Sequence, residues 1–334
     1  MFICLYRIGP VGIKSIRMVI DVKRRLCDRE IKEVSDIKVG IPGGLLYYRY
    51  ETLIHTLLNE LDIECIFSTE TNREILDMGI NCCVNEACLP MKIFHGHASN
   101  LKNKCDLLWI PRIMRGNGNE AICPKFCGLP EMVKSGIKRR EGIIDYPLYL
   151  NCSRAIRYYL KKLSKDFGCR EDKIYKAFNK AATAYGQEEK GIRDKRYPFT
   201  IFLGGHPYNI YDNFANMNLI DKLHSYGIGV ITEEQISSHR KEEEIKHLMK
   251  KPYWLFYKNN YGAGKYLVKN QRINGIVYIS SFSCGIDSIT IELLKNDIED
   301  FPLLILKVDE HTGEAGMNTR IEAFADMLER RKVH

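Results

Sequence analysis

Three cysteines of this chain stand where a ligand would be expected to bind. Cys88 lies just before a predicted helix that begins near Pro90, because proline is favoured in the first helical turn. A thiol at a helix N-terminus is a good metal ligand, since the helix dipole favours the thiolate. Cys123 lies in the loop after the third predicted strand, and Cys284 follows the apolar strand at 276–279. Ligands of parallel α/β sheets bind in such strand-to-helix loops, so these three thiols form the candidate site.

The cysteine spacing leaves several chemistries open. The chain has 12 cysteines and no CxxC pair, the usual unit of a structural zinc site, so zinc is disfavoured. Cysteines converging from separate loops suit an iron–sulfur cube, whereas inert thiols are the alternative. Cys127, at CxxxC spacing from Cys123, could supply a further ligand. Five cysteines with apolar neighbours are expected to be buried and inert: Cys4, Cys65, Cys105, Cys152 and Cys169.

Strands and helices alternate along the chain, which predicts an α/β fold with parallel sheets. The predicted strands are 37–41, 64–67, 106–110, 199–203, 228–231, 276–279 and 303–308. The predicted helices comprise one that starts near residue 46, one that begins at 71 and one that begins near 90. Residues 152–190 are predicted to be helical with a break near Gly168. Two further helices are predicted, one at 212–226 and a last one that starts near 319. We expect an N-terminal extension at 1–36, a first α/β domain with a helical insert at 37–195 and a second α/β domain at 196–334.

Composition narrows the function classes. The chain has no apolar run long enough for a membrane helix and no secretory signal, so we expect a cytoplasmic protein without structural disulfides. The net charge of +8 is concentrated at 134–165, which holds nine Lys and Arg residues against two acidic ones. This stretch is either a solvated helix face or a docking surface for an acidic partner or an anionic cofactor. Nucleic-acid binding is not expected, because no zinc-finger spacing or aromatic RNA-binding motif accompanies the charge.

Other polar residues near these positions have two interpretations each. Glu86, Lys92, His95 and His97 could tune a metal centre through hydrogen bonds, or could cap helices and face solvent. The Asp309–His311 run could act in acid–base chemistry or metal binding, or could form a capped turn, which we favour. The residues at 204–207 could cradle a phosphate, but without a phosphate-loop pattern we predict a tight turn.

Eight motifs, in order, resemble the 2-hydroxyacyl-CoA dehydratase superfamily, and most closely its acyl-CoA dehydratase activase-related branch near the double-cubane cluster proteins. They are IPGGLLYY (41–48), NEACLPMK (85–92), HGH (95–97), IPR (110–112), ICPKFCGLP (122–130), GHPYNIYD (205–212), FSCGIDS (282–288) and VDEHTGEAG with TRIEAF (308–324). The resemblance covers about residues 37–330.

The resemblance implies two flavodoxin-like or Rossmann-like domains with a [4Fe–4S] or double-cubane cluster between them. It implies that Cys88, Cys123 and Cys284 are cluster ligands; Cys127, a departure from the pattern, could be a fourth. It also implies a homo- or heterodimer, a partner ATPase of the actin/Hsp70 type with its own cluster, and a CoA thioester as substrate. The chain would then be the electron-accepting component of a low-potential reductase or 2-hydroxyacyl-CoA dehydratase system. The alternative is a non-catalytic cluster carrier or regulatory subunit of an activase complex, and whether the chain is itself an enzyme, such as a lyase, is left open.

Overall fold

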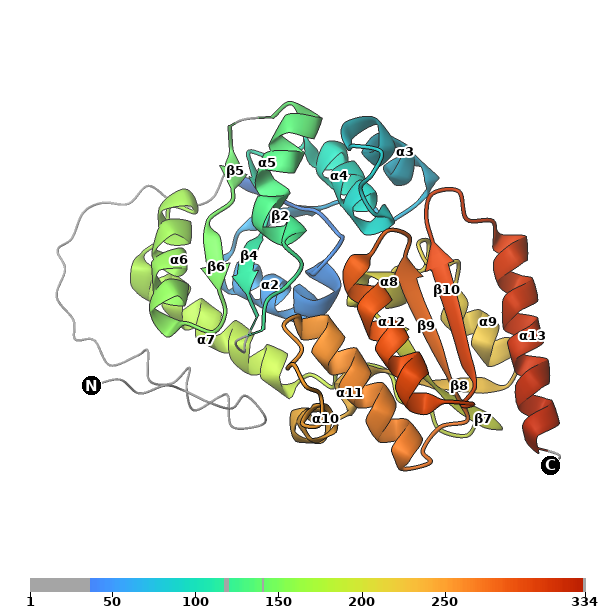
Figure 1. Cartoon of the computed structure of the whole chain (residues 1–334). Helices are drawn as coiled ribbons and strands as arrows, with labels where there is room; N and C mark the ends of the chain where they lie inside the picture. Colours follow the sequence, from blue (N-terminus) through green and yellow to red (C-terminus); the bar gives the residue numbers. More distant parts are fainter. Residues whose placement is uncertain (1–36, 117–119, 140, 333–334) are drawn as a thin grey trace. The chain divides into compact units, whose positions relative to one another are not determined.

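The computed structural model describes residues 37–116, 120–139 and 141–332, which form two compact units (Figure 1). The first unit contains residues 37–43, 47–70 and 97–189 of the described chain, and the second contains 44–46, 71–96 and 190–332. The predicted N-terminal extension, 1–36, lies outside the described residues. No helix in the described ranges is long and apolar enough to cross a membrane.

The first unit is built on a parallel four-stranded sheet in the order β2-β1-β3-β5. Its strands are β1 (Lys38–Ile41), β2 (Glu64–Phe67), β3 (Leu107–Trp109) and β5 (Ile143–Ile144). A second, two-stranded parallel sheet pairs β4 (Arg112–Arg115) with β6 (Pro147–Tyr149). The predicted strands at 37–41, 64–67 and 106–110 correspond to β1, β2 and β3, whereas β5 was not predicted.

Four helices of the described chain lie wholly within the first unit. They are α2 (Tyr47–Leu61), α5 (Lys125–Ile137), α6 (Ser153–Asp166) and α7 (Glu171–Gln187). Leu57, Leu58 and Leu61 of α2 pack with Leu160 and Leu163 of α6 and with Val39 of β1 in one apolar core. The predicted helix break is confirmed, since Gly168 adopts a φ of +62° between α6 and α7.

The second unit has its own parallel sheet, in the order β10-β9-β7-β8. Its strands are β7 (Phe199–Gly205), β8 (Ile228–Ile231), β9 (Gly275–Ser281) and β10 (Leu303–Val308). Its helices are α8 (Pro207–Ile210), α9 (Leu219–Ser225), the 3₁₀ turn η1 (Glu233–Gln235), α10 (Ser238–Ile245), α11 (Leu255–Lys269), α12 (Gly285–Ile298) and α13 (Glu314–Lys332). α11 and α12 pack with the core on one face of the sheet, and α9 and α13 with the core on the other (Figure 1). The predicted α/β fold with parallel sheets is thus confirmed.

The two units divide the chain differently from the continuous domains expected at 37–195 and 196–334. Residues 71–96, which carry α3 (Arg73–Cys82) and the start of α4 (Leu89–Leu101), belong to the second unit. The reason is apolar packing, because side chains of both helices join the core that contains β9 and β10. They are Ile75, Leu76, Leu89 and Ile93.

Two other predictions need correction. The helix expected at 212–226 is replaced by a turn, which follows α8, and by the shorter helix α9, because the side chain of Asp212 accepts hydrogen bonds from the N–H groups of Phe214 and Ala215. The last helix starts at Glu314, five residues before the expected start at 319, and buries Met317 in its first turns.

Candidate metal centre

The carboxyl ends of the second unit's strands bring polar side chains to one edge of its sheet. His206 follows β7, Cys284 follows β9 after a two-residue turn, and Glu310 follows β10. Since all four strands are parallel, these ends meet on the same side of the sheet. This is the edge at which ligand sites of such sheets occur.

Cys284 is the N-cap residue of α12 and is part-buried. Its N–H donates to the Ser281 carbonyl, and its own carbonyl accepts from the Ser288 N–H, so the loop holds its backbone at both ends. Burial raises the pKa of the Cys284 thiol to about 12, and the negative charge of Asp287 adds to this, whereas the Asp287 backbone N–H acts in the opposite direction. Without a cation nearby, this sulfur is a protonated thiol at neutral pH.

Cys88 stands directly before α4 and is also part-buried. The helix begins at Leu89, one residue before the predicted start near Pro90. Its carbonyl accepts hydrogen bonds from the N–H groups of Met91 and Lys92, which is the arrangement of a residue that begins a helix. The Cys88 thiol contributes to raising the pKa of Cys284, so the two sulfurs are within electrostatic reach of each other. Both of these expected ligands thus stand directly before a helix of the second unit.

An ion pair fixes the beginning of α4 at this edge. Lys92 donates from Nζ to Oε1 of Glu310, and their side chains are only 3% and 15% exposed. Burial opposes ionisation of Glu310, but the hydrogen bond and charge of Lys92 outweigh it and lower its pKa. Lys92 is thus a buried structural cation rather than a solvated surface residue.

His206 and Asp287 add nitrogen and oxygen donors beside Cys284. One ligand atom from each of these three residues lies within 4.8 Å of the others. His206 Nδ1 is 3.1 Å from Asp287 Oδ2, and Tyr278 donates its hydroxyl to Asp287 Oδ1 at 2.9 Å. Burial opposes ionisation of Asp287, but the charge and hydrogen bond of His206 and the bonds from Tyr278 and Ser280 lower its pKa overall. The carboxylate is therefore charged although its residue is 1% exposed.

A buried polar atom at the same edge lacks a partner. Asn209, in α8, is 1% exposed, and its Oδ1 accepts a hydrogen bond from Ser281 Oγ at 3.0 Å. Its Nδ2 has no hydrogen-bond partner among the described residues. An unsatisfied buried donor costs roughly 1–3 kcal/mol, so its presence beside a candidate site suggests an acceptor that the chain itself does not supply.

Cys123 and Cys127 belong to the first unit. Cys123 lies two residues before α5, and its carbonyl accepts from the Phe126 N–H; Cys127 is in the first turn of that helix. Arg112 donates from its guanidinium to the Cys127 carbonyl at 2.9 Å, which fixes this turn. The prediction that Cys123 lies in a strand-to-helix loop is confirmed, while its role as a ligand stays a prediction.

The other described cysteines divide by burial. All ten cysteines in the described ranges are thiols. Burial raises the pKa of Cys65 to about 11 and also raises that of Cys105 and Cys169; of these three, Cys169 is buried as expected, whereas Cys65 and Cys105 are part-buried. Cys152 is a correction, because it is exposed at the N-cap of α6 rather than buried. Cys4 lies outside the described residues.

The neighbouring histidines and the Asp309–His311 run are largely structural. His95 Nδ1 is 2.7 Å from the Met91 carbonyl, and His97 Nδ1, in the first unit, is 2.8 Å from Ser68 Oγ. Burial lowers the pKa of His97 to about 4, which keeps it neutral. Asp309 Oδ1 accepts from the His311 N–H and the Thr312 hydroxyl, so the expected capped turn is confirmed.

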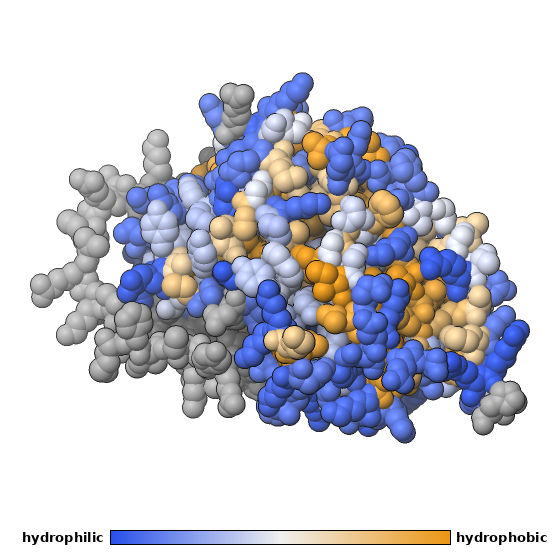
Figure 2. All heavy atoms as spheres, viewed as in Figure 1, coloured by the Kyte–Doolittle hydropathy of each residue, from blue (hydrophilic) through white to orange (hydrophobic). Residues whose placement is uncertain are grey.

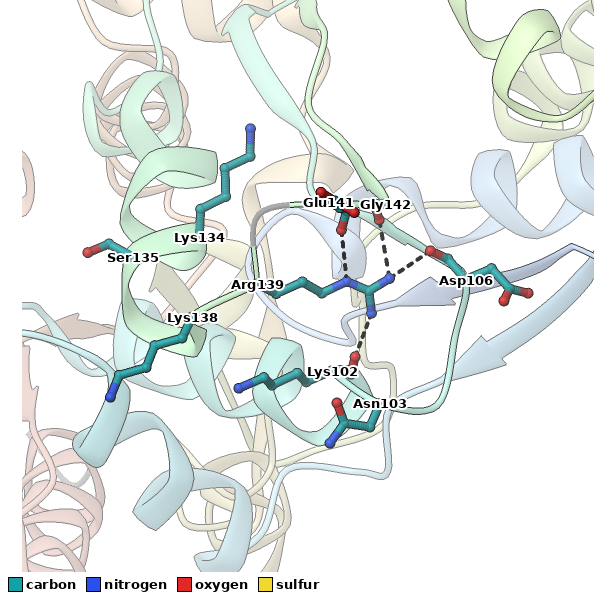
Figure 3. Close-up of a pocket in the computed structure, with 9 residues that line it drawn as sticks. All are labelled: Lys102, Asn103, Asp106, Lys134, Ser135, Lys138, Arg139, Glu141 and Gly142. Carbon is teal, nitrogen blue, oxygen red and sulfur yellow. Dashed lines mark hydrogen bonds between the residues drawn. The ribbon is translucent and has the colours of Figure 1, made fainter.

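The basic stretch at 134–165 is partly occupied by internal contacts. Figure 3 shows a hollow at the amino edge of the first unit's sheet, where the Arg139 guanidinium donates to backbone carbonyls of Lys102, Asp106 and Gly142. Lys134 pairs with Asp145 at 2.7 Å. Lys138 lies just after the C-terminus of α5, where a cation offsets the helix dipole. These contacts account for much of the charge without a ligand.

Comparison with known families decides the affiliation of the chain. Residues 38–236 match the family described as the CoA enzyme activase uncharacterised domain. The chain belongs to this family. The match agrees with the resemblance to activase-related proteins and implies an activase-related role in a CoA-enzyme system, whereas the double-cubane branch stays a prediction. No curated protein matches the chain.

The CoA enzyme activase match includes part of the candidate centre and omits the rest. It spans Cys88, Cys123, Cys127 and His206 but ends before Cys284. The sequence interpretation overlooked His206, Asn209 and Asp287 as donors. The GHPYN segment that holds the first two follows an apolar strand, and Asp287 follows Cys284 by one helical turn, so the strand-end rule that selected the cysteines could have found them.

Proposed function

We propose that this protein is an iron–sulfur protein, and that it accepts electrons in an ATP-driven low-potential reductase or 2-hydroxyacyl-CoA dehydratase system. The observation that carries the proposal is the placement of Cys88 and Cys284 at helix starts of the same unit. Each begins a helix, and both helices start at the carboxyl edge of one parallel sheet. A partner ATPase of the actin/Hsp70 type would supply the electron, as the resemblance implies.

The donor set fits an iron–sulfur cluster. Two thiols at helix N-termini provide soft ligands, and nearby N–H dipoles compensate the charge of the bound thiolates. The thiol proton of Cys284, held strongly in the metal-free chain, would leave when iron binds, because a coordinated thiol is deprotonated. The unpartnered Asn209 Nδ2 is a buried donor for which a cluster sulfur would be a suitable acceptor.

The proposed ligands are Cys88 and Cys284 of the second unit and Cys123 of the first, with Cys127 as a possible fourth ligand. The assignment of Cys123 and Cys127 depends on the family resemblance. When bound, the cluster would supply a one-electron carrier of low potential. The chain's own residues hold it: the Lys92–Glu310 pair fixes the start of α4, and the β9–α12 loop fixes Cys284.

Exposed apolar side chains lie close in sequence to these two cysteines, and such side chains are suited to contact with a partner protein. Phe282 is 63% exposed two residues before Cys284, Ile289 is 52% exposed on α12, and Val84 is 61% exposed between α3 and Cys88. Figure 2 shows apolar side chains over the region of α12. Electron transfer requires a partner to approach the centre closely, and an apolar rim would stabilise that contact.

The experiment is anaerobic purification of the full chain, followed by iron and acid-labile sulfide quantification and visible spectroscopy. We expect several irons and sulfides per chain, and loss of most of both in Cys284→Ala and Cys88→Ala. Cys152→Ala is the control, because Cys152 is exposed at a helix end in the first unit and is not a proposed ligand. Absence of iron and sulfide from the anaerobic wild type would refute the proposal. Cluster loss in Cys127→Ala would identify a fourth ligand.

A second measurement, an assay of 2-hydroxyacyl-CoA conversion, distinguishes a catalytic role from electron transfer alone. If the chain is a dehydratase subunit, 2-hydroxyacyl-CoA should be converted when the reduced activator is added. If it only carries electrons, the cluster should be reduced and reoxidised by partner proteins without such conversion.

A further inference from the structure

The ring of His206 is held rigidly beside Cys284. The residue is 1% exposed and stacks on Tyr208, with ring centroids 5.0 Å apart and planes 14° apart. The edge of Phe256 packs against it at 4.9 Å. These contacts and the hydrogen bond to Asp287 leave the ring one orientation.

Asp287 determines which ring nitrogen carries the hydrogen. Its carboxylate accepts the Tyr278 hydroxyl at Oδ1 and faces His206 Nδ1 at Oδ2, 3.1 Å away. A carboxylate only accepts hydrogen bonds, so Nδ1 must be the donor. In the neutral ring, Nε2 then carries the lone pair that a metal ion could accept.

A histidine whose Nδ1–H donates to a carboxylate while Nε2 stays available is the usual arrangement of a metal-bound histidine. The same ring lies in a group of three ligand residues whose donor atoms are within 4.8 Å of one another, and Cys284 is one of them. The Asp287 oxygens are already used by Tyr278 and His206. The imidazole and the thiol are the nitrogen and sulfur donors of the same group.

We propose that His206 is a nitrogen ligand, through Nε2, of the metal centre that Cys284 holds, and that Asp287 positions its ring. This assignment rests on the proposed iron–sulfur function and names a ligand of that same centre. No electron is transferred in forming the bond: Nε2 donates its lone pair to iron, and the hydrogen stays on Nδ1, which keeps its hydrogen bond to Asp287. A neutral imidazole in place of a thiolate leaves the cluster less negative, which favours its reduction.

The test is pulsed EPR of the reduced, reconstituted full chain, produced with histidine that is ¹⁵N-labelled only in its ring. Direct coordination gives a strong ¹⁵N hyperfine coupling that backbone amides, left at natural abundance, cannot give. We expect this coupling in the wild type and its loss in His206→Ala. The matched control is His224→Ala, because His224 also pairs with an aspartate, Asp194, at 2.7 Å and stacks on Tyr197 in the same unit. The control should keep the coupling.

Each outcome decides between the two proposals. A cluster with no histidine coupling in the wild type overturns the assignment of His206 and leaves the iron–sulfur function standing. A coupling that survives in His206→Ala also overturns it, since another histidine must then be the source. Absence of iron and sulfide from the wild type overturns both. Because the first of these readings uses the wild type alone, misfolding of His206→Ala would not prevent a decision.

Discussion

The replacement Gly79→Ala tests the packing that carries Cys88 to the centre. Alanine normally stabilises a helix by about 1 kcal/mol relative to glycine, so propensity alone predicts a more stable protein. In this fold α3 crosses α4 so closely that a Cβ at Gly79 would lie 1.8 Å from the Lys92 carbonyl oxygen. A Cβ at Gly96, on the facing helix, would lie 1.8 Å from the Ile75 carbonyl oxygen. The crossing thus depends on glycine from both sides.

The magnitude follows from that distance. Real Cβ atoms essentially never lie within 3.0 Å of such an atom, and the obstacle is backbone, so α3 and α4 would have to separate by more than 1 Å. Overpacking of this kind costs typically 1–3 kcal/mol and sometimes more, which exceeds the gain in propensity. We therefore expect the Tm of Gly79→Ala to be roughly 2–10 °C lower than that of the wild type. The double variant with Gly96→Ala should cost less than the sum, because one separation relieves both clashes.

The assay is thermal and urea unfolding of the full chain. Gly316→Ala is the control, since it lies in α13 of the same unit and a Cβ there meets nothing within 4 Å. The control should be as stable as the wild type or slightly more stable. The reasoning is refuted if Gly79→Ala matches or exceeds the stability of the control. If the iron–sulfur proposal is correct, Gly79→Ala should also retain less iron, because α4 would shift and Cys88 with it.

Three further predictions follow from buried contacts. Tyr159→Phe should lower the free energy of unfolding in urea by about 1–3 kcal/mol, because the buried Trp109 Nε1–H donates to the Tyr159 hydroxyl at 2.8 Å. The control Tyr158→Phe, at a side chain 56% exposed, should change it almost not at all, and equal effects of the two variants would contradict the assignment. Lys92→Met should cost roughly 1.5–3 kcal/mol at neutral pH. Because Lys92 lowers the pKa of Glu310 in the folded state, this cost should shrink as pH falls below about 4.5, while the exposed Lys295→Met should have little effect at any pH. In the metal-free chain, iodoacetamide should label the exposed Cys152 far faster than Cys284 at pH 8, and the labelling rate of Cys284 should rise towards pH 12, because the thiolate is the reactive form. Comparable labelling rates at pH 8 would disprove the raised pKa of Cys284.

The strands were largely predictable because short apolar runs bounded by glycine, proline and polar residues carry a clear signal. The predicted strands at 64–67, 228–231 and 303–308 coincide with β2, β8 and β10. The helix expected at 212–226 failed for a local reason. Asp212 and Asn216 use their side chains to bond nearby backbone groups, and Met217 and Asn218 adopt φ of +56°, so the segment folds as a turn. The Asp and Asn content of this segment was the signal that apolar periodicity obscured.

The edge of the sheet that holds the candidate ligands was predictable, but the division of the cysteines between the two units was not. Six cysteines between residues 82 and 127 look like one cluster in the sequence. The fold separates them, because Cys82, Cys83 and Cys88 belong to the second unit and Cys105, Cys123 and Cys127 to the first. Cys88 instead contributes to the raised pKa of Cys284, which is almost 200 residues away in the sequence.

That long-range encounter depends on interactions that no local pattern encodes. It requires the Gly79–Gly96 crossing, the apolar faces of α3 and α4 in the core of the second unit, and the buried Lys92–Glu310 pair. The crossing joins two consecutive helices, whereas the other two contacts join segments far apart in sequence, and all three form only when the chain has folded. The same is true of His206 and Asp287, which are separated by 81 residues and yet share a hydrogen bond beside Cys284. A strand-end rule can therefore select candidate residues one at a time, whereas the composition of the centre is set by how the crossing helices and parallel strands bring them together.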